Sequence, residues 1–247
     1  MKVLVACEES QAVTKELRRL GHEAYSCDII ECSGGHPEWH IQADVLSVLN
    51  PTQYCTSAGD VFEGIEFKTI DGVAHTIQPK WDMIIAHPPC TYLTNGGAVR
   101  VFRKESKEYP PYGTFQMVNI ERLKQGMRGR DFFMQIMNAN CDRIAIENPI
   151  PMSIYMLPPC TQIVQPYEYG DPYSKKTCLW LKGIPTLKPT NVLKVYQPFI
   201  NGGGGRMERE NYKGKTFANG SCGRSKTFPG IAKAMAEQWA GDARKDK

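Results

Sequence analysis

Short apolar runs alternate along this chain with segments of helical periodicity, and this alternation constrains the fold more than any other feature. Apolar residues at helical spacing from Ala12 to Leu20 predict a helix that Gly21 ends. Strands that alternate with helices predict an α/β fold: a mostly parallel sheet with helices on both faces. We expect strands at residues 2–6, 23–27, 81–86, 143–146 and 178–181, and helices at 11–20, around 120–139 and from Pro229 onward.

One segment, residues 53–80, interrupts this pattern. Its stretch IEFKTIDGVAHTI has alternating apolar residues on either side of Asp71-Gly72, which predicts a small inserted hairpin. A chain of 247 residues can bury one sizeable core. We find no internal repeat and predict a single domain over residues 1–247.

Cysteine usage and hydropathy predict a cytoplasmic protein with no membrane partner. The nine cysteines lack the spacing of a small disulfide-linked secreted domain, which is typical of a reducing compartment. The first residues, MKVLVACEES, contain too short an apolar stretch for a signal peptide. No apolar run approaches the roughly 18 residues of a membrane span.

Positive charge is concentrated in two segments. Residues 1–99 have 6 basic and 13 acidic side chains, whereas residues 100–130 have 8 and 3, and residues 202–226 have 6 and 2. Two basic segments on a neutral-to-acidic body favour a polyanionic partner, most simply nucleic acid. Either segment alone is equally typical of a solvated surface loop. The four consecutive glycines at 202–205 predict a mobile loop within the second segment.

Three of the predicted strands lead into reactive or hydrogen-bonding residues. The strand at 81–86 is followed by HPPC, which ends at Cys90; the strand at 143–146 is followed by ENP, which begins at Glu147; the second strand leads to Asp28. Because ligands of parallel sheets bind at the carboxyl ends of the strands, we expect these groups to converge. A thiol beside a carboxylate suggests covalent catalysis. Taken singly, each has a plainer interpretation: a space-filling cysteine, a loop carboxylate and a turn residue.

The order of these motifs resembles that of the DNA cytosine-5 methyltransferases, most closely their compact phage- and prophage-encoded relatives. The similarity covers nearly the whole chain and implies the Rossmann-like fold of S-adenosylmethionine-dependent methyltransferases. Enzymes that methylate an exocyclic amine instead have Asp or Asn, two prolines and an aromatic residue, where this chain has His87 and Cys90 at the outer positions. The matching motifs are the strand ending at Asp28, Asp44 in QADV, PPC at 88–90, ENP at 147–149 and YGDPYSKKT at 169–177.

The resemblance implies transfer of a methyl group from S-adenosylmethionine to carbon 5 of a cytosine in DNA. The Cys90 thiolate would add to carbon 6 of the ring, and Glu147 would hold or protonate ring nitrogen 3. Lys175 stands, with Lys176, where the family usually has Arg-x-Arg beside the target base. The base must leave the DNA stack, and we expect residues 94–113 to form a mobile loop that assists this. The basic segments 100–130 and 202–226 would contact phosphates.

The resemblance also implies a set of residues that bind the cofactor. Asp28 would accept hydrogen bonds from the ribose hydroxyls, and Asp44 would reach the adenine amino group. Ser225, in GRSKTF at 223–228, falls in a motif that closes over the cofactor in the family. The remaining two are Glu8, in the turn after the first strand, and Pro88 of the PPC motif.

Besides the lysines that stand in place of Arg-x-Arg, the chain departs from the family in two further places. The turn after the first strand, ACEES, has none of the usual glycines, although a cofactor without phosphates needs no phosphate-binding turn. A short loop region at 186–222 replaces a separate target-recognition domain. Consequently the basic glycine-rich loop and the insert at 53–80 read the DNA sequence, or selectivity is low, or the substrate is not duplex DNA.

Two other functions remain open on the sequence alone. The substrate can be another pyrimidine, in RNA or a free nucleotide, or the chain can be a non-catalytic nucleic-acid-binding protein on the same fold. A metal site also has to be considered, because Cys27, Cys32, His36 and His40 have a spacing that zinc tolerates. Cys27 lies inside a predicted strand, however, and we therefore predict no metal.

Overall fold

The computed structural model describes residues 1–55, 59–108, 113–198 and 226–244. Within these residues the main sheet has seven strands in the order β11-β13-β10-β7-β1-β2-β3. Neighbouring strands are parallel except for β13, which runs antiparallel to both β10 and β11. The predicted α/β class with a mostly parallel sheet is therefore confirmed. The strands are β1 (Lys2–Ala6), β2 (Glu23–Asp28), β3 (His40–Gln42), β7 (Met83–Ala86), β10 (Ile144–Pro149), β11 (Gln162–Val164) and β13 (Thr177–Lys182).

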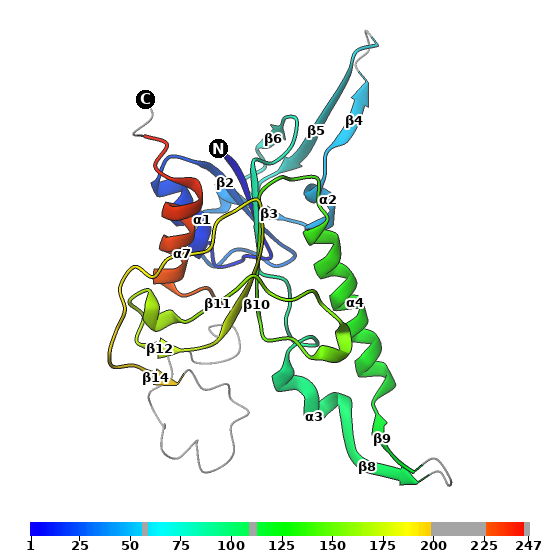
Figure 1. Ribbon diagram of the computed structural model, residues 1–247. Coiled ribbons are helices and arrows are strands. Elements are labelled where there is room, and N and C mark those ends of the chain that lie inside the picture. Colours follow the sequence, from blue (N-terminus) through cyan, green and yellow to red (C-terminus); the bar gives the residue numbers. More distant parts are fainter. Residues whose placement is uncertain (56–58, 109–112, 199–225, 245–247) are drawn as a thin grey trace.

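Helices cover both faces of the sheet (Figure 1). Along β1, Val3 and Val5 pack on the face covered by α1 and α7, whereas Leu4 and Ala6 pack on the face covered by α2 and α4. Successive side chains of a strand point to opposite faces, so an entirely apolar run is buried on both sides only in a sheet of this kind. The helices are α1 (Ala12–Arg19), α2 (Leu46–Leu49), α4 (Ile120–Met137), α7 (Pro229–Met235) and the π-helical turn η5 (Ala236–Ala240).

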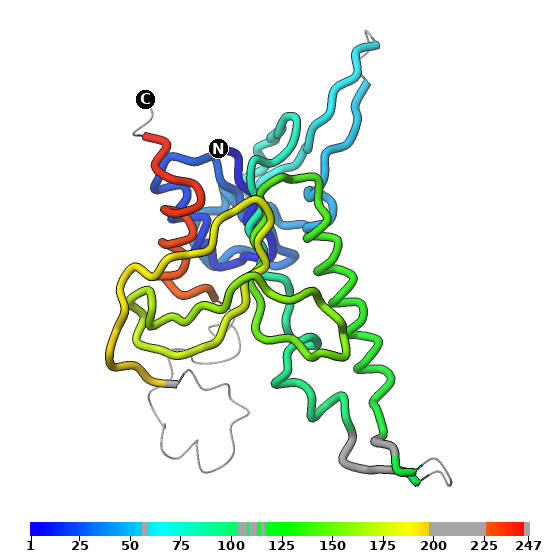
Figure 2. Tube along the Cα trace, viewed as in Figure 1, coloured from blue at the N-terminus to red at the C-terminus, as the bar shows by residue number. Residues whose placement is uncertain are grey.

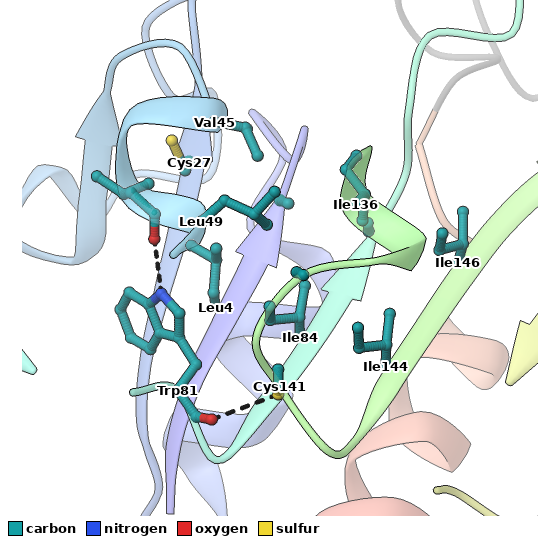
Figure 3. Close-up of a cluster of buried hydrophobic side chains, with 14 of the residues drawn as sticks. Leu4, Cys27, Val45, Leu49, Trp81, Ile84, Ile136, Cys141, Ile144 and Ile146 are labelled. Carbon is teal, nitrogen blue, oxygen red and sulfur yellow. Dashed lines mark hydrogen bonds between the residues drawn. The ribbon is translucent and has the colours of Figure 1, made fainter. Parts of the chain in front are cut away.

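Figure 3 shows the core on the face covered by α2 and α4. Trp81 is 1% exposed, and its indole N–H donates to the carbonyl of Val48 at 2.7 Å. The thiol of Cys141 donates to the carbonyl of Trp81 at 3.3 Å. These bonds join α2 and the turn after α4 to the start of β7. The apolar side chains around them include Leu4, Leu49, Ile84, Ile136, Ile144 and Ile146.

The segment 53–80 forms an antiparallel sheet of its own. It consists of β4 (Thr52–Cys55), β5 (Val61–Lys68) and β6 (Ala74–Ile77), and Gly72 in the β5–β6 turn has a φ of 86°. The base of this insert is buried against the main core through Ile65 and Ile77. The insert leads into the start of β7, so it lies toward the amino ends of the parallel strands, and β4 and β5 project from that end (Figures 1 and 2).

The described part of the segment 94–113, where we expect a mobile loop after Cys90, contains regular secondary structure. It contains η2 (Asn95–Gly97), α3 (Ala98–Val101) and the antiparallel strands β8 (Phe102–Glu108) and β9 (Thr114–Val118). The physical reason is an apolar anchor, because Leu93 and Val101 are fully buried against Met152 and Tyr155. The remaining short elements are η1 (Pro37–Trp39), η3 (Ser153–Tyr155), η4 (Pro166–Glu168), β12 (Tyr173–Ser174) and β14 (Gln197–Pro198).

Part of the segment 186–222 is described, and it includes β14. The glycine run at 202–205 and the basic residues between 202 and 225 lie outside the described residues. Across the described ranges, no helix has both the length and the apolar character needed to cross a bilayer.

Candidate active site

The strand order creates a switch point between β1 and β7. From β1, the chain proceeds to β2 and β3 on one side, and then to β7 and β10 on the other. At such a point the carboxyl ends of the strands leave room for a ligand. β13 is antiparallel, so its first residue, Thr177, pairs with Pro149 at the end of β10. The turn that contains Lys175 therefore reaches the same edge of the sheet.

β10 is longer than predicted, which corrects the placement of Glu147. The sequence suggests a strand that ends at Ile146, but Glu147, Asn148 and Pro149 all continue the pairing with β13. Pairing with β7 does stop at Ile146, which lies opposite Ala86. Beyond that point β10 has β13 on one side only, and a proline is compatible with such an edge position.

Glu147 is hydrogen-bonded to His87. The register that aligns Ala86 with Ile146 places these two residues side by side, and Oε2 of Glu147 lies 3.0 Å from Nδ1 of His87. Their side chains are 12% and 7% exposed, respectively. Burial acts to lower the pKa of His87, but the hydrogen bond and charge of Glu147 outweigh it and raise that pKa. Burial likewise acts to raise the pKa of Glu147, but the net change is a lowered pKa, because the hydrogen bond and charge of His87 act against burial.

Cys90 and Lys175 belong to the same electrostatic cluster. Burial raises the pKa of the Cys90 thiol above its ordinary value; the charge of Glu147 adds to this rise, and the charge of Lys175 opposes it. Lys175 also contributes to the lowered pKa of Glu147. Its ammonium group lies 5.8 Å from the centre of the Phe228 ring. The structure thus brings together the three residues predicted to be catalytic.

The loop that carries Cys90 is hydrogen-bonded to the end of β10, which carries Glu147, and to the segment after it. The side chain of Asn148, 1% exposed, donates from Nδ2 to the carbonyl of Pro88 at 3.0 Å. Further along, the Met152 N–H donates to the carbonyl of Leu93 at 2.8 Å, and the Leu93 N–H donates to the carbonyl of Cys90 at 3.0 Å. The thiol and the carboxylate are therefore held on one rigid frame rather than on two independent loops.

Glu8 caps helix α1 with a buried carboxylate. Oε1 accepts from the Val13 N–H at 2.6 Å, and Oε2 accepts from the N–H and hydroxyl of Thr14 at 3.2 and 2.7 Å. Glu8 is 3% exposed, and burial raises its pKa, an effect that the charge of His87 opposes. These contacts give Glu8 a structural role, and its predicted contact with a cofactor stays a prediction.

The turn between β1 and α1 contains two residues in the left-handed backbone conformation that glycine usually adopts, although neither is a glycine. Cys7 and Gln11 have φ values of 58° and 55°, in the left-handed region, which costs an ordinary residue roughly 1–2 kcal/mol. The side chain of Gln11 offsets part of this cost. Its Nε2 donates to the carbonyl of His36 at 2.8 Å and to Ser26 Oγ at 3.2 Å, and its Oε1 accepts from the His36 N–H at 3.0 Å.

Asp28 and Asp44 lie near the end of β1, on the side away from Cys90 in the strand order. Asp28 Oδ1 accepts from the Ile30 N–H at 3.2 Å, and Asp44 Oδ1 accepts from the Leu46 N–H at 2.9 Å. Burial raises the pKa of the Cys7 thiol, and the charges of both aspartates raise it further. Both predicted cofactor ligands are therefore close to the switch point.

Pro88 and Ser225 are the other two residues predicted to bind the cofactor. Pro88 is buried at the exit of β7. Ser225 lies outside the described residues.

The histidines considered for zinc have other contacts: both ring nitrogens of His40 are hydrogen-bonded, to Ser26 and Ile30, and the ring of His36 stacks on Trp39. Within the described ranges, no group of three or more His, Cys, Asp or Glu is arranged to hold a metal ion.

His87 was not among the residues predicted for the site, although it is hydrogen-bonded to Glu147. The sequence contains a sign of this contact, because His87 and Glu147 each directly follow the last residue of an apolar run. Only the strand order and register show that the two strands are neighbours. Thr227, two residues before the start of α7, was also not predicted as a site residue, and its hydroxyl lies 3.3 Å from Nδ1 of His87.

The arrangement combines a thiol, a carboxylate hydrogen-bonded to an imidazole, and a nearby cation. Together these groups can add a nucleophile to an electron-poor ring and move a proton as they do so. No family model and no curated protein matches the sequence, so the interpretation depends on the residues themselves.

Proposed function

We propose that this protein transfers a methyl group from S-adenosylmethionine to carbon 5 of cytosine in DNA. The observation that carries the proposal is the cluster of Cys90, Glu147 and Lys175 at the switch point of a mostly parallel sheet. Carbon 6 of cytosine accepts a nucleophile only if the ring is polarised at the same time. A thiol next to a proton donor meets that requirement. The α/β sheet is compatible with the Rossmann-like methyltransferase fold that the motif order implies.

The turn after β1 supports a cofactor without phosphates. In nucleotide-binding folds the N–H groups at the start of the first helix bind a phosphate. Here the carboxyl group of Glu8 already accepts from the Val13 and Thr14 N–H groups, so these donors are not available to a phosphate. S-adenosylmethionine fits this condition, and when bound it supplies an electrophilic methyl group. Under this proposal Asp28 accepts from the ribose hydroxyls, and Asp44 accepts from the adenine amine.

The side chains at the catalytic edge would act on the base as follows. Cys90 attacks carbon 6 as the thiolate, which the positive charge of Lys175 favours. Glu147 lies close to the thiol and interacts with ring nitrogen 3. Lys175 contacts the carbonyl oxygen of the base. The raised pKa of Cys90 means that the thiol form predominates in the free protein, so the thiolate is a minor species until the base is bound.

A DNA partner is supported by the position of the first basic segment. Residues 100–130 include α3, β8, β9 and the start of α4, which follow Cys90 directly in the chain. Arg122 on α4 donates from Nη2 to the carbonyl of Thr91 at 2.9 Å and lies 4.6 Å from the centre of the Tyr92 ring. The basic helix is thereby attached to the loop that carries the nucleophile.

Covalent trapping on DNA that contains 5-fluorocytosine tests the proposal. With S-adenosylmethionine present, we expect the wild-type protein to form an adduct that survives denaturant, because fluorine cannot leave carbon 5 as a proton does. Cys90→Ala should form none. Cys55→Ala is the matched control, because Cys55 is exposed on β4 of the insert, and it should form the adduct normally.

The outcome also separates the rival substrates. The proposal would be contradicted if Cys90→Ala formed an adduct, or if the wild-type protein formed no adduct on DNA. Trapping on the matching RNA or on a free fluorinated nucleotide, without trapping on DNA, would assign one of the other pyrimidine substrates. Loss of trapping in Cys55→Ala would show that the assay reports folding rather than chemistry.

A further inference from the structure

His87 lies in the strand order between two buried carboxyl groups. Glu8 lies just after β1, His87 directly follows β7, and Glu147 lies in β10, one residue beyond its last pair with β7; these three strands are adjacent in the sheet. Nδ1 of His87 is 3.0 Å from Oε2 of Glu147. An imidazole flanked in this way by carboxyl groups is placed to hold a proton and to pass it to one of them.

The surroundings of His87 favour its charged form. Burial acts to lower the pKa of His87, but Glu147 and Glu8 together outweigh burial and raise it. The charge of Lys175 opposes this rise, and the other polar neighbour is the hydroxyl of Thr227. Nε2 is buried and has no hydrogen-bond partner among the described residues. The contact that connects His87 to the chemistry is therefore Nδ1 with Glu147.

We propose that His87 and Glu147 act as one proton-holding pair, in which His87 supplies, through Glu147, the proton that ring nitrogen 3 takes up when Cys90 adds to the base. The inference rests on the proposed function and deepens it. His87 is a positioning residue under this proposal, since it acts through Glu147 and does not touch the base itself. It also orients the carboxylate by donating from Nδ1.

The addition step balances as a proton transfer coupled to bond formation. The sulfur–carbon 6 bond forms from the thiolate electron pair, and the ring electrons shift toward carbon 5 and nitrogen 3. The N–H bond at Nδ1 of His87 breaks, a proton is delivered by Glu147, and the N–H bond at nitrogen 3 forms. The imidazole is left neutral. Reversal of the addition returns the proton to the pair, so no oxidant or further reactant is needed.

The pair has a distinctive effect on the pH dependence of kcat/KM. Activity needs Cys90 without its proton and the pair with one proton. The ordinary pKa values are 6.5 for histidine and 9.0 for cysteine, and both groups are shifted upward here, with Glu8, Glu147 and Lys175 as the charged neighbours. As pH rises through the pKa of the pair, the gain in thiolate is offset by loss of the proton. The rate should therefore rise and then level off before Cys90 titrates.

His87→Asn tests this directly, because Asn keeps an N–H near the position of Nδ1 but cannot ionise. Tritium release from DNA labelled at cytosine carbon 5 gives kcat/KM across the pH range. We expect the variant to be slower by roughly 10²-fold near neutral pH, the lower end for a lost acid–base group. We also expect its rate to keep rising with pH up to the titration of Cys90, without the level region. His75→Asn, on the insert, should keep the wild-type profile.

The outcomes distinguish this inference from the function on which it depends. A wild-type protein that releases no tritium overturns the proposed function and the inference together. Normal wild-type release with a level region retained in His87→Asn overturns the inference alone. If His87→Asn does not fold, nitrogen-15 spectra of the wild-type histidines decide: a positively charged His87 ring at pH 7 supports the pair, and a neutral ring overturns it.

Discussion

His87 and Glu147 show how two ionisable side chains can be stable at very low exposure. Moving either charge out of water alone is costly, and the cost is offset only when an opposite charge is close and well oriented. The 3.0 Å hydrogen bond between Nδ1 and Oε2 meets this condition. Removal of one partner would leave the other buried and unpaired, which is why a variant that changes both residues is the better probe of stability.

The pair's contribution to the free energy of unfolding should be greatest at mildly acidic pH. The pKa of His87 is raised, so its contribution is complete below the ordinary value of 6.5 and is lost as pH rises through the folded value. The pKa of Glu147 is lowered, so its contribution is complete above 4.5 and is lost as pH falls through the folded value. Urea unfolding of the wild type and of His87→Asn/Glu147→Gln should differ most between these values. A difference that does not change with pH would contradict the charged pair.

Helix α4 supports the site by packing against both catalytic loops. Leu93 and Val101 follow Cys90, Met152 and Tyr155 follow Glu147, and together they form an apolar cluster beside α4. Tyr155 is fully buried and lies directly over Gly126, where an added Cβ would be 2.0 Å from its ring. The missing side chain at residue 126 therefore lets the two loops approach the helix.

Two glycines three residues apart on α4 provide a matched test. Gly126→Ala should destabilise the fold by about 1–3 kcal/mol, since Tyr155 must move, and should slow adduct formation. At Gly129 an added Cβ would meet the Leu93 side chain at 3.4 Å, an ordinary contact. Gly129→Ala should therefore gain roughly 0.5–1 kcal/mol from helix propensity. Thermal unfolding of both variants checks the sign, and equal effects would show that Tyr155 does not constrain the helix.

The elements that the sequence predicted are those with strong apolar patterns of their own. β1, β7 and α1 belong to this group. β3 and β11 were missed because each has three residues and lies at an edge of the sheet, too short for a periodic signal. The convergence of Cys90 and Glu147 was predictable, since each follows a buried strand. The bond from His87 to Glu147 was not, because it depends on which strands are neighbours and on their register.

On the scale of the whole molecule, the two projecting parts lie at opposite ends (Figures 1 and 2). The insert of β4, β5 and β6 connects to the start of β7, whereas β8 and β9 follow the loop after its carboxyl end. The first basic segment, 100–130, belongs to the second projection, whereas residues 1–99, which include the insert, have 13 acidic and 6 basic side chains. Under the proposed function, the insert is therefore poorly placed to read DNA at the edge that carries Cys90, and the end formed by β8, β9 and α4 is the better candidate.

The salt dependence of DNA binding tests whether DNA contacts the end formed by β8, β9 and α4 rather than the insert. Lys124 and Arg128 are exposed on α4, and if each contacts a phosphate, neutralising both should reduce the slope of log affinity against log salt by about 2. Lys15→Ala/Lys68→Ala is the control with the same change of charge, because these exposed lysines lie on α1 and on the insert, and it should leave the slope unchanged. Fluorescence anisotropy between about 50 and 200 mM salt gives both slopes, over a range in which phosphate-dependent binding weakens steeply. Equal changes in the two double variants would mean that the attraction depends on net charge alone, and an affinity independent of salt would remove the phosphate contacts altogether.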